Sequence, residues 1–135
     1  MSELLEKARS YEAKKIAATD KESKPLFHIS APAGWINDPN GFSVYNGKIH
    51  LFYQYYPYLR EWGPMHWGHS TTSDMIKWEQ LPCVLAPDEE YDKKGCFSGS
   101  AIEADGKHVL VYTGVTRIKL PDGSEQERQN QCIGF

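Results

Sequence analysis

The segment Gly34–Gly41 brings together residue types that could do chemistry on a sugar. It contains one carboxylate, two amides and one indole, which belong to Asp38, Asn37, Asn40 and Trp35. A carboxylate beside an apolar ring is typical of a sugar pocket. The same letters also favour a sharp turn, because Pro39 fixes φ for a first turn position and Asn-Gly tolerates positive φ. From these residues alone we predict a structural turn, with a catalytic sugar site as the alternative.

Three other groups of residues are candidate sites by residue type. The acidic cluster Asp88, Glu89, Glu90 and Asp92 is interpreted as a solvated loop and not as a catalytic group. His66 and His69 lie three positions apart, and on a strand an odd separation sends side chains to opposite faces. The three cysteines lack the CxxC spacing of a zinc site. We therefore predict reduced cysteines and no metal site.

Composition excludes several classes of partner. The chain has 135 residues, the length of one domain, and a formal net charge of −3 without a basic stripe. We therefore predict neither a nucleic-acid nor a membrane partner. Residues 1–24 contain no continuous apolar run, so they predict neither a signal peptide nor a membrane span. The expected location is cytoplasmic.

The first part of the chain is predicted to be an amphipathic helix. Residues 2–19 are good helix formers. The apolar residues that roughly share one face are Leu4, Leu5, Ala8, Tyr11 and Ile16. Residues 20–24 form a polar linker, and Pro25 ends any helical continuation. We therefore divide the chain into a helical leader and linker, residues 1–24, and a domain, residues 25–135.

After Pro25 the pattern is all-β, with short apolar runs separated by turn signals. The strands of a first meander are predicted at residues 41–45, 48–55, 65–70 and 78–81. Those of a second are predicted at residues 97–103, 107–113 and 131–135. Asn46-Gly47 and Asp105-Gly106 each predict a tight hairpin turn.

The two meanders resemble each other, which favours a repeat architecture. Gly47 and Gly106 lie 59 positions apart, and a tyrosine follows each glycine six residues later. Four-stranded units at such a period are typical of β-propeller blades, with a β-sandwich as the alternative. Continuous apolar runs at Leu51–Tyr53 and Val109–Tyr112 favour the propeller, whose sheets are covered on both faces. Repeat folds need about three units or more, so the chain is expected to be truncated, with apolar faces exposed.

Five blocks in order resemble the β-fructofuranosidases of glycoside hydrolase family 32, which include invertases, inulinases, levanases and sucrose-6-phosphate hydrolases. The blocks are Trp35–Gly41, His50–Tyr55, Trp62–His69, Ser73-Asp74 with Trp78, and Phe97–Ala101. The resemblance covers about residues 26–135 and implies a five-bladed β-propeller with a funnel-shaped active site at its axis. Of this propeller the chain would hold blade one and most of blade two.

The resemblance also implies the roles of individual residues. Asp38 would be the nucleophile of a retaining mechanism that uses two carboxylates and no cofactor. The residues that would line or border the sugar site are Trp35, Ile36, Asn37, Asp38, Gln54, Trp62, Phe97 and Ser98. From the residues alone, Trp62 could instead be an exposed loop aromatic, Phe97 a core residue and Gln54 a hydrogen-bonding residue between blades. The family's later Arg-Asp and Glu-Cys motifs are absent, so the chain would carry the nucleophile without the acid/base and be inactive alone.

The predicted function is hydrolysis of the terminal β-D-fructofuranoside bond of sucrose or sucrose 6-phosphate. The expected cytoplasmic location favours the phosphorylated sugar, for which Arg60, Lys93 and Lys94 are available as phosphate ligands. A fructan hydrolase or fructosyltransferase of the same family is one alternative. A non-catalytic carbohydrate-binding module is another. The sequence indicates no oligomeric state.

Overall fold

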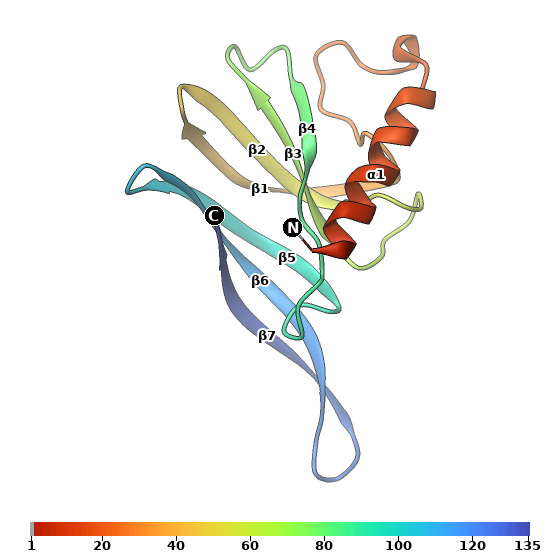
Figure 1. Ribbon diagram of the computed structural model, residues 1–135, viewed down its shortest axis with the longest axis vertical. Coiled ribbons are helices and arrows are strands. Elements are labelled where there is room, and N and C mark those ends of the chain that lie inside the picture. Colours follow the sequence, from red (N-terminus) through yellow and green to blue (C-terminus); the bar gives the residue numbers. More distant parts are fainter. Residues whose placement is uncertain (1) are drawn as a thin grey trace.

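Two antiparallel sheets and one α-helix make up residues 2–135, which a computed structural model describes (Figure 1). The helix is α1, Glu3–Ala18, and a short 3-10 helix, Lys21–Ser23, follows it. The first sheet has the order β1 Trp35–Tyr45, β2 Lys48–Tyr56, β3 His66–Thr72 and β4 Glu79–Leu85. The second has the order β5 Gly95–Ala104, β6 Lys107–Lys119 and β7 Glu125–Gly134. The predicted all-β class with two meanders is confirmed.

Both predicted hairpin turns are confirmed. Asn46 and Gly47 have φ of 49° and 72°, and Asp105 and Gly106 have φ of 50° and 71°. Two successive residues with positive φ form the turn whose twist matches that of the flanking strands. The register of both hairpins is therefore fixed by two residues that tolerate this backbone.

The structural turn predicted at Gly34–Gly41 is wrong, because this segment is the bulged first part of β1. The pairing of β1 with β2 shifts between Ile36 and Pro39 and again between Asn40 and Ser43. Gly34 and Gly41 have φ of 57° and 52°. The positive-φ signal is therefore real, but the glycines bound an extended, irregular strand and do not reverse the chain.

Several strands are longer than predicted. β4 continues to Leu85 through Pro82, which is allowed because β4 is an edge strand. β7 begins at Glu125 and not at residue 131, and its first residues are exposed and polar. Without a buried face they show no apolar alternation. The β6–β7 hairpin extends away from the rest of the molecule (Figure 1).

The predicted helix is confirmed, but its buried face differs from the predicted one. The hydroxyl of Ser2 caps the helix and accepts a hydrogen bond from the Leu5 N–H at 3.2 Å. The buried residues are Ala8 and Glu12, whereas Leu4 and Ile16 are each 43% exposed. The pattern of apolar residues cannot predict that Glu12 is buried, because its burial depends on a hydrogen-bond partner outside the helix.

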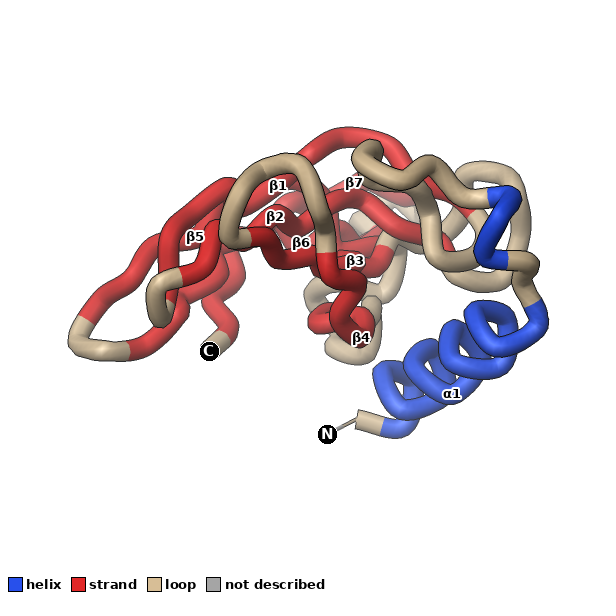
Figure 2. The backbone as a smooth tube through the Cα atoms, turned by 90° about the horizontal axis from the view of Figure 1, so that it is seen from above, coloured by secondary structure: helices blue, strands red, loops and turns tan. Residues whose placement is uncertain are grey.

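That partner is the backbone of Cys83 on β4, the outer strand of the first sheet. Arg9 Nε donates to the Cys83 carbonyl at 2.7 Å, and Glu12 Oε2 accepts from the Cys83 N–H at 3.1 Å. The Tyr11 hydroxyl also donates to the Tyr58 carbonyl at 3.1 Å. The helix is thus fixed along one side of the sheets, as Figure 2 shows.

Two clusters of buried side chains form the core. The first lies between the sheets and contains Phe52, Trp67, Cys96, Leu110, Tyr112 and Cys132. The second lies between the first sheet and α1 and contains Ala8, Tyr53, Tyr55 and Cys83. The first sheet is therefore covered on both faces, and all three cysteines are buried free thiols.

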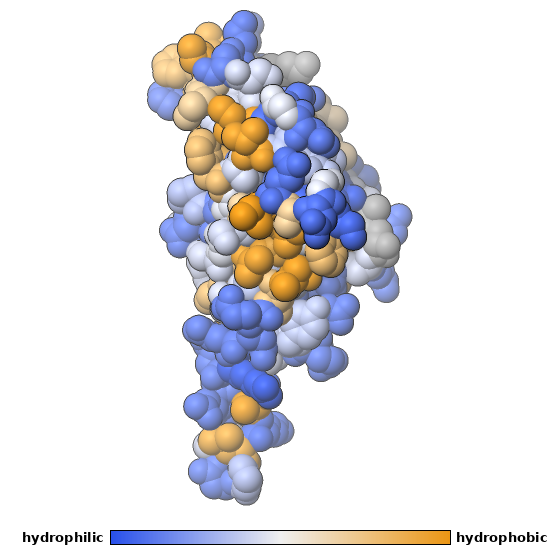
Figure 3. All heavy atoms as spheres, turned by 90° about the vertical axis from the view of Figure 1, so that its left-hand side faces the viewer, coloured by the Kyte–Doolittle hydropathy of each residue, from blue (hydrophilic) through white to orange (hydrophobic). Residues whose placement is uncertain are grey.

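Apolar side chains also remain on the surface, as predicted. Phe42 and Val44 on β1 are 59% and 64% exposed, and Ile102 on β5 is 61% exposed. A group of apolar residues is visible on the face shown in Figure 3. In the described part of the chain no helix is long and apolar enough to cross a bilayer.

Candidate active site

The first strands of the two sheets, β1 and β5, lie side by side (Figure 1). The Gly99 N–H donates to Asn40 Oδ1 at 3.4 Å, and a Cβ at Gly41 would lie 3.1 Å from the Cβ of Ala101. Residue numbers rise together along both strands, so β1 and β5 run in the same direction. Asp38 therefore lies at the same end as Phe97 and Ser98.

Asp38 is exposed on β1, so its carboxylate is open to a ligand from solvent. Beside it, Trp35 Nε1 donates to Asn37 Oδ1 at 2.8 Å. This bond fixes the Asn37 amide and leaves its nitrogen as the group that could donate to a sugar hydroxyl. Ile36 is half-buried and pairs with Tyr55 of β2. Four neighbouring predicted residues are thus held on one strand segment.

Trp62 and Phe97 meet although they lie in different parts of the chain. Their rings are arranged edge to face with centroids 6.1 Å apart. Trp62 is 52% exposed, and Phe97 is half-buried. Trp67 Nε1 also donates to the Phe97 carbonyl at 3.2 Å. The pair forms an apolar wall with one solvent-facing ring, which suits contact with the apolar face of a sugar.

Gln54 connects the two sheets. It is only 3% exposed, and its Nε2 donates to the Cys96 carbonyl at 3.0 Å. This contact fits the alternative interpretation of Gln54 as a hydrogen-bonding residue between blades. Ser98, two positions after Cys96, is exposed. Gln54 therefore positions the strand that carries Phe97 and Ser98, and its contact with a sugar stays a prediction.

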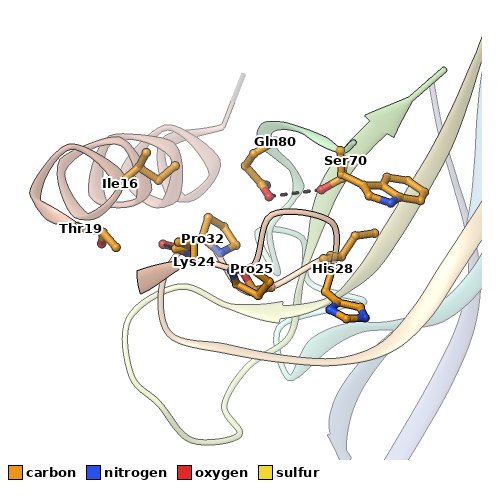
Figure 4. Close-up of a pocket in the computed structure, with 11 residues that line it drawn as sticks. Ile16, Thr19, Lys24, Pro25, His28, Pro32, Ser70 and Gln80 are labelled. Carbon is orange, nitrogen blue, oxygen red and sulfur yellow. Dashed lines mark hydrogen bonds between the residues drawn. The ribbon is translucent and has the colours of Figure 1, made fainter. Parts of the chain in front are cut away.

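A cavity of about 240 Å³ lies elsewhere, between α1, residues 24–32 and the strands β3 and β4 (Figure 4). Residues that line it include Ile16, Lys24, Ser70 and Gln80. Ser70 donates to Gln80 Oε1 at 3.2 Å, as the dashed line in Figure 4 shows. None of the predicted sugar-site residues lines this cavity, so it is separate from the Asp38 segment.

The acidic cluster between the sheets is not the uniformly solvated loop that was predicted. Asp92 is fully buried, accepts from the Tyr112 hydroxyl at 2.8 Å and accepts from the Glu89 N–H at 2.8 Å. Burial is the main cause that raises the pKa of Asp92. Its oxygens are used to close the loop, so Asp92 does not supply a second carboxylate at the site.

Three histidines from both sheets form a cluster that pattern reasoning missed. His50 Nδ1 lies 2.9 Å from His69 Nε2, and the His50 and His108 rings have centroids 4.7 Å apart. Burial, reinforced by His50 and His108, lowers the pKa of His69 to about 3. Among residues 2–135, no three His, Cys, Asp or Glu side chains are arranged to hold a metal ion. The His50 and His69 rings are stacked, and the His108 ring meets the His50 ring edge to face.

Comparison with known proteins finds one family model and relatives that match most of the chain. The profile of the Glycosyl hydrolases family 32 N-terminal domain matches residues 28–135. A sucrose-6-phosphate hydrolase of Escherichia coli is 49% identical over 109 residues, covering 81% of this chain and 23% of the relative. A levanase of Bacillus subtilis is 48% identical over 134 residues, covering 98% of this chain and 19% of the relative.

A solved structure shows the same arrangement of sheets. The Bombyx mori GH32 beta-fructofuranosidase BmSUC1 superposes with a TM-score of 0.78 at 45% sequence identity. The superposition covers 96% of this chain and 27% of that one. The chain thus spans about a quarter or less of the proteins that it matches.

Proposed function

Because the chain belongs to glycosyl hydrolase family 32 and its two sheets are blades of that family's β-propeller, we propose that it supplies the catalytic nucleophile of a β-fructofuranosidase. The reaction is hydrolysis of the terminal β-D-fructofuranoside bond of sucrose or sucrose 6-phosphate. The proposal rests on one observation: Asp38 is exposed on β1 at the same end at which Phe97 and Ser98 lie on β5. We infer that a carboxylate, an apolar wall and a hydroxyl face one sugar at this end.

In this mechanism Asp38 attacks the anomeric carbon of the fructosyl group and forms a covalent ester. A second carboxylate about 5 Å away protonates the leaving oxygen and then activates the water that cleaves the ester. A strand that is paired with β2 and packed beside β5 holds the attacking oxygen in place, which lowers the entropy cost of reaction. Neither an Arg-Asp nor a Glu-Cys pair occurs in these 135 residues, so we expect no turnover from them alone.

The sugar would be held from two sides. The Asn37 amide nitrogen and the Ser98 hydroxyl offer hydrogen bonds, and Trp62 with Phe97 offers apolar surface. Gln54 acts on this site through its bond to the Cys96 carbonyl. Helix α1 carries none of the proposed sugar-site residues and packs against β4.

The substrate is proposed to be sucrose 6-phosphate or sucrose, and the enzyme to act in the cytoplasm. The relatives include both a sucrose-6-phosphate hydrolase and a levanase, so the choice needs a direct test. Product analysis of the full-length protein with sucrose, sucrose 6-phosphate and inulin separates the three. Release of fructose from inulin alone would contradict the proposed substrate while leaving the role of Asp38 intact.

The substitution Asp38→Asn tests the nucleophile. In the full-length protein we expect kcat to fall by about 10⁴-fold or more while sugar binding is retained, because the ester can no longer form. Asp105→Asn, in the β5–β6 turn, is the matched control, since asparagine also tolerates the positive φ found there. Unchanged turnover in Asp38→Asn would exclude the mechanism. Sugar binding without any turnover in the unsubstituted protein would instead support a carbohydrate-binding module.

A further inference from the structure

A second cavity, of about 280 Å³, lies between the end of α1, the linker and the segment that follows β2. Its lining includes three cationic side chains, Lys15, Lys24 and Arg60, and no carboxylate. It shares Thr19, Lys24 and Pro32 with the neighbouring cavity, and Figure 4 shows these three residues near the helix. The cavity thus takes one cationic residue from each of three segments: α1, the linker and the segment after β2.

The three cations have no acidic partner in residues 2–135 of the structure. None of them takes part in an ion pair there. Lys24 Nζ donates to the carbonyl oxygens of Ala31 at 2.5 Å and Pro32 at 3.4 Å, which carry no charge. Lys15 Nζ lies 5.5 Å from the centre of the Tyr11 ring. Within the described residues, no ion pair therefore neutralises the positive charge of the cavity.

Asp20, an acidic residue of the linker that does not line the cavity, makes a local contact. Asp20 Oδ1 accepts a hydrogen bond from the Glu22 N–H at 3.0 Å, which closes the short 3-10 helix. Burial lowers the pKa of Lys24, so the ammonium has lost part of its hydration without gaining a counter-charge. An anion bound in the cavity would supply that charge.

We propose that this cavity binds the phosphate group of a compact phosphomonoester. A guanidinium presents two parallel N–H donors to phosphate oxygens, and ammonium groups add point charges, so Arg60 with two lysines matches a dianion. Tyr11 and Tyr58 form an aromatic wall, with ring centroids 5.1 Å apart. A sugar ring attached to the phosphate could pack on that wall.

The cavity adjoins the proposed active site but is a different place. Gly34 is among its lining residues, and β1 with Trp35 and Asp38 follows directly. A phosphate bound there would contact the segment that carries the nucleophile. Its source is either a phosphorylated sugar or free inorganic phosphate. The proposal concerns binding and does not depend on the hydrolytic mechanism.

Calorimetric titration of the full-length protein at low ionic strength, with inorganic phosphate and with glucose 6-phosphate, tests the proposal. In the variant Lys15→Gln with Arg60→Gln we expect both dissociation constants to rise by about tenfold or more. Lys107→Gln with Lys119→Gln removes the same charge from the second sheet and should leave both constants unchanged. Lys24 is kept, because its bonds to Ala31 and Pro32 hold the linker.

The two titrants distinguish the sources of phosphate. Equal affinity for both supports free phosphate as the ligand, and tighter binding of glucose 6-phosphate with the same sensitivity to substitution supports a phosphorylated sugar. Absence of saturable binding for both titrants in the unsubstituted protein would overturn the proposal. Undiminished binding in the Lys15 and Arg60 variant would overturn it as well.

Discussion

The side-chain amide of Gln54 on β2 donates a hydrogen bond of 3.0 Å to the carbonyl of Cys96 on β5. One position further along β5, the Phe97 carbonyl accepts from Trp67 Nε1 of β3 at 3.2 Å. The start of β5 is therefore held by two side chains of the first sheet. Because Phe97 and Ser98 lie there, the geometry of the proposed sugar site depends on how the two sheets contact each other.

Replacing Gln54 by methionine should destabilise the contact between the sheets. The variant keeps the shape of the side chain but leaves the Cys96 carbonyl without this donor in a buried place. We expect the free energy of unfolding to fall by about 1–3 kcal/mol. Urea unfolding followed by tryptophan fluorescence measures it. Gln129→Met, at an exposed position of β7, is the control, and equal stability of both variants would contradict the role of Gln54.

Replacing Trp62 by alanine should weaken sugar binding more than chemistry. The exposed indole stands edge to face against Phe97 and is far more accessible than the ring that it contacts. We expect KM of the full-length protein to rise by about tenfold, with a smaller change in kcat. Trp78→Ala is the control, since Trp78 lines the cavity beside α1. An unchanged KM would place the sugar away from this wall.

Sequence reasoning succeeded where a local pattern decides the structure. The Asn46-Gly47 and Asp105-Gly106 turns follow from two residues that tolerate positive φ. It failed at Gly34–Gly41, because positive φ at both ends is shared by a turn and a bulged strand. Pairing with β2 makes this segment a bulged strand and not a turn, and the local sequence does not predict that pairing.

Acid should destabilise the fold through His66 and His69. Burial lowers their pKa values to about 4 and about 3, from an ordinary value of 6.5. Between the pKa in the folded chain and the ordinary pKa of 6.5, each histidine is protonated in the unfolded chain but not in the folded one. The free energy of unfolding therefore falls as the pH falls below about 6.5. We expect each histidine to remove about 2 kcal/mol by pH 5. Unfolding in urea at pH 7 and pH 5 measures the difference.

Two variants assign this pH dependence. His69→Gln should reduce the stability difference between pH 7 and pH 5, whatever its stability at pH 7. His28→Asn, at an exposed position, should leave the difference as it is. If His69→Gln and the unsubstituted protein lost the same stability on acidification, the proton uptake would belong to other groups.

Replacing Glu12 by alanine should loosen α1 from the first sheet. The Cys83 N–H would lose its acceptor in a buried place, which we expect to cost about 1–3 kcal/mol of unfolding free energy. Glu12→Gln keeps an acceptor oxygen and should recover most of that loss, and Glu6→Ala, on the exposed side of α1, should cost little. Thermal unfolding of the three variants measures the order. Equal melting temperatures would show that the helix is held by other contacts.

Contacts between distant residues set the limit of what sequence could tell. Glu12 and Cys83 are 71 positions apart, and Gln54 and Cys96 are 42 apart. From its residue type alone, a glutamate is expected on the surface. A glutamine is equally compatible with a sugar site and with a contact between blades. Only the folded arrangement assigns each polar side chain to the backbone group that it satisfies.

The bonds of Arg9 and Glu12 to the Cys83 backbone should also affect the association of one molecule with another. An outer strand with free N–H and C=O groups is a template on which a second chain can add, and repeated addition leads to aggregates. At Cys83 of β4, side chains of α1 bond to the backbone N–H and C=O that another strand could otherwise pair with. We therefore expect α1 to hinder the addition of a second chain to β4 at Cys83.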